Sequence, residues 1–250
     1  MYSLEIECDP DDRDLLVAEL WELGSAGIVE LTARRVRAFF EDAILLEDLQ
    51  RLYPGSVFRQ EEQRDWVQSA RDMLQPMAVG ARFFLVPEWR DDPAPAGRFR
   101  IAVNPGMAFG TGVHETTQLC IEALEECVTP GSSVLDVGTG SGILAQVAKM
   151  LGAGKVYACD VDPVAVEIAR DGFVGSVDAV AGQSVELVVA NISPEAIAAL
   201  ATDLLRVLRP GGTLLASGFE LHEVEQVRQS LPPGAELREK GNWALLVAKR

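Results

Sequence analysis

The sequence predicts an α/β protein, in which a parallel β-sheet covered by helices on both faces follows a smaller α+β domain. From about residue 115, apolar strands without polar alternation take turns with helices, a pattern typical of a parallel sheet buried on both faces. Residues 1–62 instead show short elements in the order βαββαβ, that of a ferredoxin-like unit. We therefore predict a ferredoxin-like domain over 1–62, a linker helix within 63–80 and the larger domain over 81–250.

Composition excludes several classes of protein. The 250 residues carry 22 basic and 38 acidic side chains, a net charge of −16 that repels nucleic acids and anionic membranes and attracts a basic partner. No window approaches the roughly 18 apolar residues of a transmembrane helix, and the acidic start lacks the features of a signal peptide. These two observations predict a cytoplasmic protein. The four cysteines have no metal-binding spacing, so we expect reduced thiols and no metal site.

Hydrophobic periodicity and turn residues place the individual elements. In the first domain, the start of the first helix is marked by Asp9, Pro10, Asp11 and Asp12 and its end by Gly24. Helices are expected at 43–53, 65–74, 115–127, 143–151, 163–170 and 194–208. Strands are expected at 2–7, 26–31, 37–40, 56–60, 82–87, 133–137, 155–160, 185–190, 213–217, 235–239 and 243–248. The last two strands form a hairpin, which makes one edge strand antiparallel.

A glycine-rich loop carries the strongest functional signal. An apolar strand leads into D-V-G-T-G-S-G over residues 136–142, and a helix follows. The backbone at Gly138, Thr139 and Gly140 can approach a ligand closely, and the helix start can bind a carboxylate. Asp136 can accept hydrogen bonds from a ligand ammonium, directly or through water. These features favour a nucleotide-like amino-acid cofactor over a dinucleotide, whose G-x-G-x-x-G spacing the third glycine misses by one residue, and over a purely structural turn.

A second acidic residue, Asp160, ends the next strand, where a carboxylate can accept both hydroxyls of a ribose. Its alternative role, capping the following helix, is better filled by Asp162 with Pro163. Val161 is a further candidate for cofactor contact. The loop and Asp160 together resemble the class I S-adenosylmethionine methyltransferases, a resemblance that covers about residues 115–250. It implies a Rossmann-like sheet of seven strands with one antiparallel edge.

A narrower resemblance rests on N-P-G-M-A-F-G-T-G-V-H-E-T-T over residues 104–117 and V-A-N-I over 189–192. The Asp65-Trp66 pair and the late Gly241-Asn242-Trp243 run agree with it. Together they resemble the methyltransferases of ribosomal protein L11, the PrmA family. The resemblance implies that the first domain recognises the basic ribosomal protein and that S-adenosylmethionine is the cofactor. It also implies that Thr117, Gly138, Asp160 and Asn191 bind this cofactor, with Phe109 and Thr111 lining the site.

Asn191 ends a parallel strand where related amine and amide methyltransferases carry an N-P-P-Y-type motif. Its amide oxygen can accept an N–H from a substrate amine and aim the lone pair of that amine. Asn191 is therefore the candidate catalytic residue. Capping the next helix is its alternative role, which Ser193 serves better. His114 has three candidate roles: a base, a hydrogen-bond partner of the 106–112 loop, or a neighbour of the helix that follows.

Three other functions are weighed against methylation of L11. The same fold can methylate another protein or a small molecule, or can bind cofactor without turnover. A dehydrogenase is the third. Binding without turnover is suggested by the short 171–186 segment. In this segment Gly175-Ser176 stands where an acid often binds the adenine amino group, and Asp178 is a poor substitute for that acid. The oligomeric state is left open, with a monomer expected and no direct nucleic-acid or membrane partner.

Overall fold

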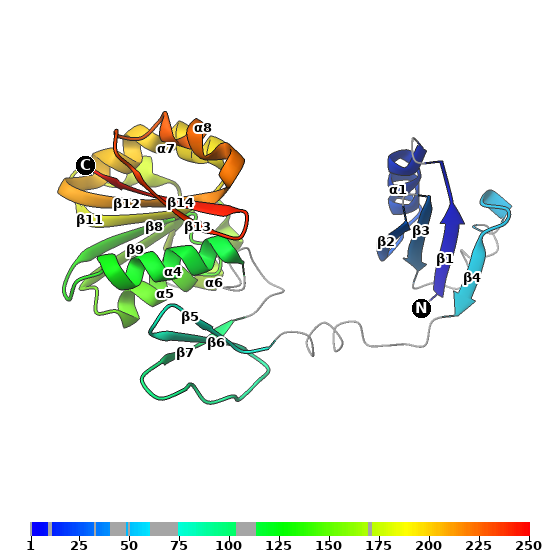
Figure 1. The fold of residues 1–250 in the computed structure, drawn as a ribbon, viewed down its shortest axis with the longest axis horizontal. Coiled ribbons are helices and arrows are strands. Elements are labelled where there is room, and N and C mark those ends of the chain that lie inside the picture. The colour runs from blue at the N-terminus through cyan, green and yellow to red at the C-terminus, as the bar shows by residue number, and fades with distance from the viewer. Residues whose placement is uncertain are drawn as a thin grey trace. The chain divides into compact units, whose positions relative to one another are not determined.

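The computed structural model of the chain describes residues 2–9, 12–32, 34–40, 49, 51–60, 75–103, 114–169 and 172–250. The fold separates into two compact units, residues 1–73 and 74–250, which are described one by one (Figure 1). The predicted linker helix over 65–74 and its Asp65-Trp66 pair lie outside the described residues. The predicted domain boundaries therefore stay a prediction.

The first unit is a four-stranded antiparallel sheet with a helix on one face. Strands β1 (Tyr2–Glu7), β2 (Gly27–Thr32), β3 (Arg35–Phe40) and β4 (Val57–Gln60) have the order β2-β3-β1-β4. This is the strand order of a ferredoxin-like unit, as predicted. Leu16 and Leu20 of α1 (Arg13–Glu22) are buried in one cluster with Leu4 and Val36 of the sheet.

The start of α1 differs from the expectation. The helix begins at Arg13 and Asp12 is its N-cap, without a side-chain cap. The backbone N–H of Asp12 donates to the carbonyl of Asp9 over 3.0 Å, so Asp9, the expected N-cap, lies before the helix. Most of the predicted helix over 43–53 lies outside the described residues.

The second unit is built on a seven-stranded sheet of order β10-β9-β8-β11-β12-β14-β13. Four parallel pairings run from β10 to β12, and β14 is antiparallel to both of its neighbours. The predicted hairpin and its antiparallel strand are confirmed. That strand lies one place inside the edge, because β13 pairs with its outer side. The strands are β8 (Ser133–Val137), β9 (Lys155–Asp160), β10 (Gly172–Val174), β11 (Val185–Asn191), β12 (Leu208–Glu220), β13 (Glu236–Lys240) and β14 (Trp243–Lys249).

Helices cover both faces of this sheet, as its continuous apolar strands predict (Figure 1). On one face, Val134 of β8 joins a cluster with α4 (Glu115–Cys127) and α5 (Ile143–Met150). On the other, Leu135 joins a cluster with α7 (Pro194–Val207) and α8 (Val224–Arg228). The remaining helical segments are α6 (Pro163–Ala169), η2 (Val177–Ala179) and η3 (Leu221–Glu223).

A small three-stranded sheet packs against the α4 face. It consists of β5 (Met77–Val79), β6 (Phe83–Pro87) and β7 (Phe99–Val103) in the order β5-β6-β7. Phe83 and Ile101 are fully buried in the same cluster as Leu119 of α4. Only β6 was expected from the sequence, since β5 is very short and β7 begins with two exposed residues.

Membrane and metal-binding features are absent from the described part of the chain. Its helices include none that is both long and apolar enough to span a membrane. Within the same ranges, His, Cys, Asp and Glu form no group of three or more that could hold a metal ion. All four cysteines are unpaired.

A β-bulge at Gly218 brings β12 against the residue that follows Asn191. The pairing of β12 with β14 shifts between Ser217 and Phe219, and Gly218 has a φ of +104°. A Cβ at this position would overlap the backbone of Ile192. Glycine is therefore required here for both backbone conformation and space.

We expect Gly218→Ala to destabilise the second unit more than Gly211→Ala does. Gly211 also has a positive φ, +79°, but no heavy atom lies within 4 Å of an added Cβ. The control Gly211→Ala should lower the free energy of unfolding by roughly 1–2 kcal/mol, because alanine is strained in a left-handed backbone conformation. Gly218→Ala should lower it by about 1–3 kcal/mol more, because its Cβ also overlaps Ile192. Urea unfolding of the two variants measures the difference. Equal losses would show that the contact with Ile192 does not matter.

Candidate functional site

The carboxyl ends of parallel strands bring the predicted site residues to one edge of the large sheet. β8, β9 and β11 run parallel to one another across direct pairings, with β8 in the middle. The glycine loop therefore follows β8 at this edge, between Asp160 at the end of β9 and Asn191 at the end of β11. Ligands of open α/β sheets bind at such an edge, where the connections leave in opposite directions.

The glycine loop is tied to β9 by its backbone. The N–H groups of Gly138 and Thr139 donate to the carbonyl of Cys159 over 2.9 and 3.1 Å. Gly138 has a φ of +71°, and a Cβ there would overlap the side chain of Ile192. The loop ends in Gly142, the N-cap of α5. N–H groups in the first turn of a helix lack intrahelical acceptors, so they can bind an anion such as a carboxylate.

Asp136 supports this loop from inside the protein. Its side chain is fully buried, and its Oδ2 accepts the Thr139 hydroxyl over 2.7 Å and the Ala145 N–H over 3.1 Å. Its Oδ1 is buried and has no hydrogen-bond partner among the described residues. Burial in the low-dielectric interior raises the pKa of Asp136 to about 6, and the nearby charge of Asp160 contributes.

Asp160 is placed to receive a ligand beside the loop. Its Oδ2 accepts the N–H of Gly140 over 2.9 Å, and its Oδ1 accepts the N–H of Asp162 over 3.0 Å. Each carboxylate oxygen can accept more than one hydrogen bond, so both keep capacity for the hydroxyls of a ribose. The side chain of Val161 is 76% exposed, and it is available to cover a bound ligand. The Asp162 Oδ1 accepts the N–H of Val164 over 2.8 Å, so Asp162 caps the helix that begins at Pro163, as expected.

Asn191 contacts the predicted cofactor residue Thr117. The Asn191 Nδ2 donates to the Thr117 hydroxyl over 3.4 Å, and Thr117 is fully buried on α4. This donation orients the amide and leaves its oxygen as an acceptor. The N-cap of α7 is Ser193, whose hydroxyl accepts the N–H of Ala196 over 3.3 Å. The capping alternative for Asn191 is thereby excluded.

His114 is the N-cap of α4. Its Nδ1 accepts the N–H of Thr116 over 3.3 Å and lies 2.8 Å from the hydroxyl of that residue. Its ring meets Trp243 of β14 edge to face, with centroids 4.4 Å apart. Of its three predicted roles, the structure supports that of a helix neighbour. Phe109 and Thr111, predicted to line the site, lie outside the described residues.

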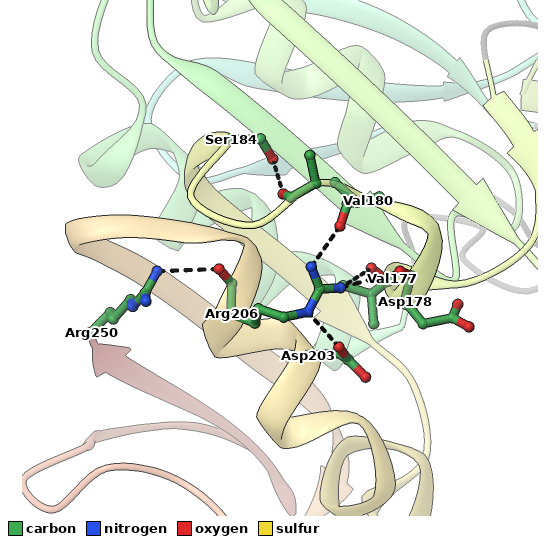
Figure 2. Close-up of polar contacts among 8 residues, drawn as sticks. Val177, Asp178, Val180, Ser184, Asp203, Arg206 and Arg250 are labelled. Atoms are coloured by element: carbon green, nitrogen blue, oxygen red, sulfur yellow. Dashed lines mark hydrogen bonds and ion pairs between the residues drawn. The ribbon is translucent and has the colours of Figure 1, made fainter.

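One residue that sequence reasoning missed holds the connection between β10 and β11. The Arg206 guanidinium donates to the carbonyls of Val177, Asp178 and Val180 and pairs with Asp203 (Figure 2). Its partners are mostly backbone carbonyls, which every residue has, so no spacing in the sequence could reveal it. Asp178, the substitute considered for an adenine-reading acid, is exposed, and its carboxylate points away from Arg206 (Figure 2).

These features fit S-adenosylmethionine. An unpartnered buried oxygen on Asp136 can serve an ammonium directly or through water. The start of α5 suits a carboxylate, and Asp160 suits the two ribose hydroxyls. The glycine at 138 leaves the edge of the sheet free of a side chain. The described groups thus suit the ammonium, the carboxylate and the ribose of an amino acid joined to a nucleoside.

Comparisons with known proteins agree with one another. The sequence profile of the family "Ribosomal protein L11 methyltransferase (PrmA)" matches residues 30–250. A relative of that name from Symbiobacterium thermophilum is 40% identical over 96% of this chain and 83% of its own length. Another from Pelobacter propionicus is 34% identical over 99% and 97%. The crystal structure of ribosomal protein L11 methylase from Lactobacillus delbrueckii subsp. bulgaricus superposes with a TM-score of 0.65 and 30% identity, over 71% of this chain and 99% of that one.

We expect Asp136→Asn to change how stability depends on pH. The folded chain holds a proton on Asp136 up to about pH 6, whereas the ordinary pKa is 3.8, so the unfolded chain releases it earlier. Relative to the variant, the wild type should therefore be most stable below pH 4 and lose up to roughly 3 kcal/mol as the pH rises through 6. Denaturant unfolding at several pH values measures this. A constant difference between the two proteins across this pH range would contradict the raised pKa of the buried Asp136 carboxyl.

Proposed function

The chain belongs to the ribosomal protein L11 methyltransferase (PrmA) family, and from that premise we propose that it methylates amino groups of ribosomal protein L11. It is an S-adenosylmethionine-dependent protein methyltransferase by family and by fold. The observation that carries the proposal is the meeting of Asn191 and Thr117 beside the loop supported by Asp136. From the proposed ribosomal substrate we infer that the reaction takes place in the cytoplasm.

Binding of the cofactor is proposed to use the two acids and the loop between them. Bound S-adenosylmethionine supplies an electrophilic methyl group on a positively charged sulfur. Asp160 would hold the ribose hydroxyls, and the start of α5 would hold the carboxylate. Asp136 keeps Thr139 and the loop in the shape that this binding needs. A loop held by such internal hydrogen bonds has less conformational freedom to lose on binding, which lowers the entropic cost.

Asn191 is the proposed catalytic residue because it can align the attacking amine. Its Nδ2 is engaged by Thr117, so its oxygen is the atom left to accept an N–H from the substrate. Holding an amine by one N–H directs its lone pair, and such alignment is a major source of rate in a displacement. A lysine must lose its proton first, from a free pKa of about 10.4. Exclusion of water and a nearby positive charge both lower that pKa, so no dedicated base is needed.

Charge supports a basic protein as substrate. The net charge of −16 attracts a basic partner at long range, and this attraction should weaken as salt is added. We propose that the ferredoxin-like first unit recognises this partner. It is a compact unit with its own buried core, so it can present a binding surface of its own.

We expect Asn191→Ala to lower methyl transfer to unmethylated L11 by about 100-fold, as for the loss of a well-placed transition-state contact. Binding of S-adenosylmethionine, measured by calorimetry, should change much less. Thr117→Val should also lower methyl transfer, but by less, because it removes the hydroxyl that orients the Asn191 amide. Thr117→Ser, which keeps the hydroxyl, is the matched control. Transfer of labelled methyl groups measures all four proteins.

Two results would contradict the proposed function. If the wild type binds S-adenosylmethionine but transfers no label to L11, the substrate is a different one or the chain does not turn over. If Asn191→Ala transfers methyl groups at the wild-type rate, Asn191 does not align the amine.

Removal of the first unit should separate the two proposed tasks. A chain of residues 74–250 keeps every described residue of the proposed cofactor site and forms a compact unit. We expect it to bind S-adenosylmethionine with an affinity within about threefold of the full chain, a difference of less than 1 kcal/mol. Its activity on L11 should fall below detection. Undiminished activity of the shortened chain on L11 would show that the first unit does not recognise the substrate.

A further inference from the structure

Arg206 fastens the short connection between β10 and β11 at several points. Its Nη1 donates to the carbonyl of Val180 over 2.8 Å, and its Nη2 donates to those of Val177 and Asp178 over 3.2 Å each. Its Nε pairs with Asp203 over 2.6 Å, one turn earlier on α7. Figure 2 shows the guanidinium lying between Asp203 on one side and the three carbonyls on the other. One side chain thus orders the turn that leaves the edge of the sheet.

The backbone of Arg206 orders the rest of this connection. Its carbonyl accepts the N–H of Gln183 over 3.0 Å, and the next carbonyl, of Val207, accepts the N–H of Ser184 over 2.8 Å. Gln183 has a φ of 54°, the one positive value among the non-glycine residues described. Val177 is fully buried in the core beside α7. The connection is therefore held by hydrogen bonds and by a buried side chain, although it is short.

The position of this turn relates it to one end of the cofactor. β8, β9 and β10 are neighbours in that order, and their carboxyl ends lie at the same edge. The loop after β8 suits the amino-acid end and Asp160 on β9 suits the ribose, so the base should continue toward the end of β10. The turn begins there, since the N–H of Gly175 donates to the carbonyl of Asp160 over 2.9 Å.

We propose that Arg206 is a positioning residue for the adenosine end of S-adenosylmethionine, an inference that rests on the cofactor of the proposed function. Arg206 acts through the backbone of residues 177–180, whose carbonyls it holds directly after Gly175-Ser176. A fixed turn can present backbone N–H and C=O groups to a base, so no adenine-reading carboxylate is required at Gly175-Ser176. The planar fork of arginine suits several carbonyls at once, whereas the ammonium of lysine is a compact point charge.

The test is calorimetric titration of the full chain with S-adenosylmethionine alone, followed by steady-state methyl transfer to L11. We expect Arg206→Ala to raise both the Kd and the KM for S-adenosylmethionine about tenfold, with kcat at saturation within twofold of the wild type. Arg206→Lys should remain closer to Arg206→Ala than to the wild type when the Kd values are compared on a logarithmic scale. The matched control is Arg209→Ala, which removes a nearby exposed arginine that pairs, among the described residues, with Glu186 at the amino end of β11 and not with residues 175–180. Its Kd should stay within twofold.

Several outcomes would overturn the inference. A Kd for Arg206→Ala within twofold of the wild type would do so, as would an equal loss in Arg209→Ala or a fall in kcat at unchanged KM. If Arg206→Ala does not fold, Arg206→Lys and Asp203→Ala decide by the same criterion, with rises of at least threefold expected. A wild type that binds S-adenosylmethionine without methylating L11 contradicts only the proposed substrate. A wild type that does not bind it contradicts both.

Discussion

Two hydrogen bonds to the buried carboxylate of Asp136 hold the glycine loop in place, and the rest of the proposed cofactor site depends on them. One comes from the Thr139 hydroxyl within the loop and the other from the backbone of Ala145 in α5. Burying a carboxylate is costly unless it accepts hydrogen bonds, so this group has few alternative positions. It links the end of β8, the loop and the helix that follows into one rigid element.

This rigid element determines what can bind beside it. Asp136 and Asp160 place two acidic groups next to the start of α5, where N–H groups favour an anion. A ligand that carries both a cation and a carboxylate satisfies this arrangement, and a dinucleotide with its two phosphates does not. The close approach of Gly138 to Ile192 brings the same element to the strand end that carries Asn191. The residues proposed to support the cofactor and the residue proposed to align the substrate are therefore in direct structural contact through Ile192.

Much of the fold and of the site could be predicted from the sequence, because those features have local signatures. The order βαββαβ and the unbroken apolar strands gave the two sheets, and the glycine run with Asp136 and Asp160 marked the carboxyl edge. The separate strands β5 and β7 could not be predicted, because their short sequences lack a clear period. Arg206 was missed for another reason. Its contacts are with backbone carbonyls, and tertiary packing alone brings them together.

The most direct test of the site is a crystal structure of the chain with S-adenosylhomocysteine, the product form of the cofactor. The account predicts the ribose hydroxyls within hydrogen-bond distance of Asp160, the carboxylate at the start of α5 and the adenine beside the turn after β10. The sulfur should lie at the edge between Gly138 and Asn191. Density for the ligand at any other place on the chain, or a ribose that does not contact Asp160, would contradict the account.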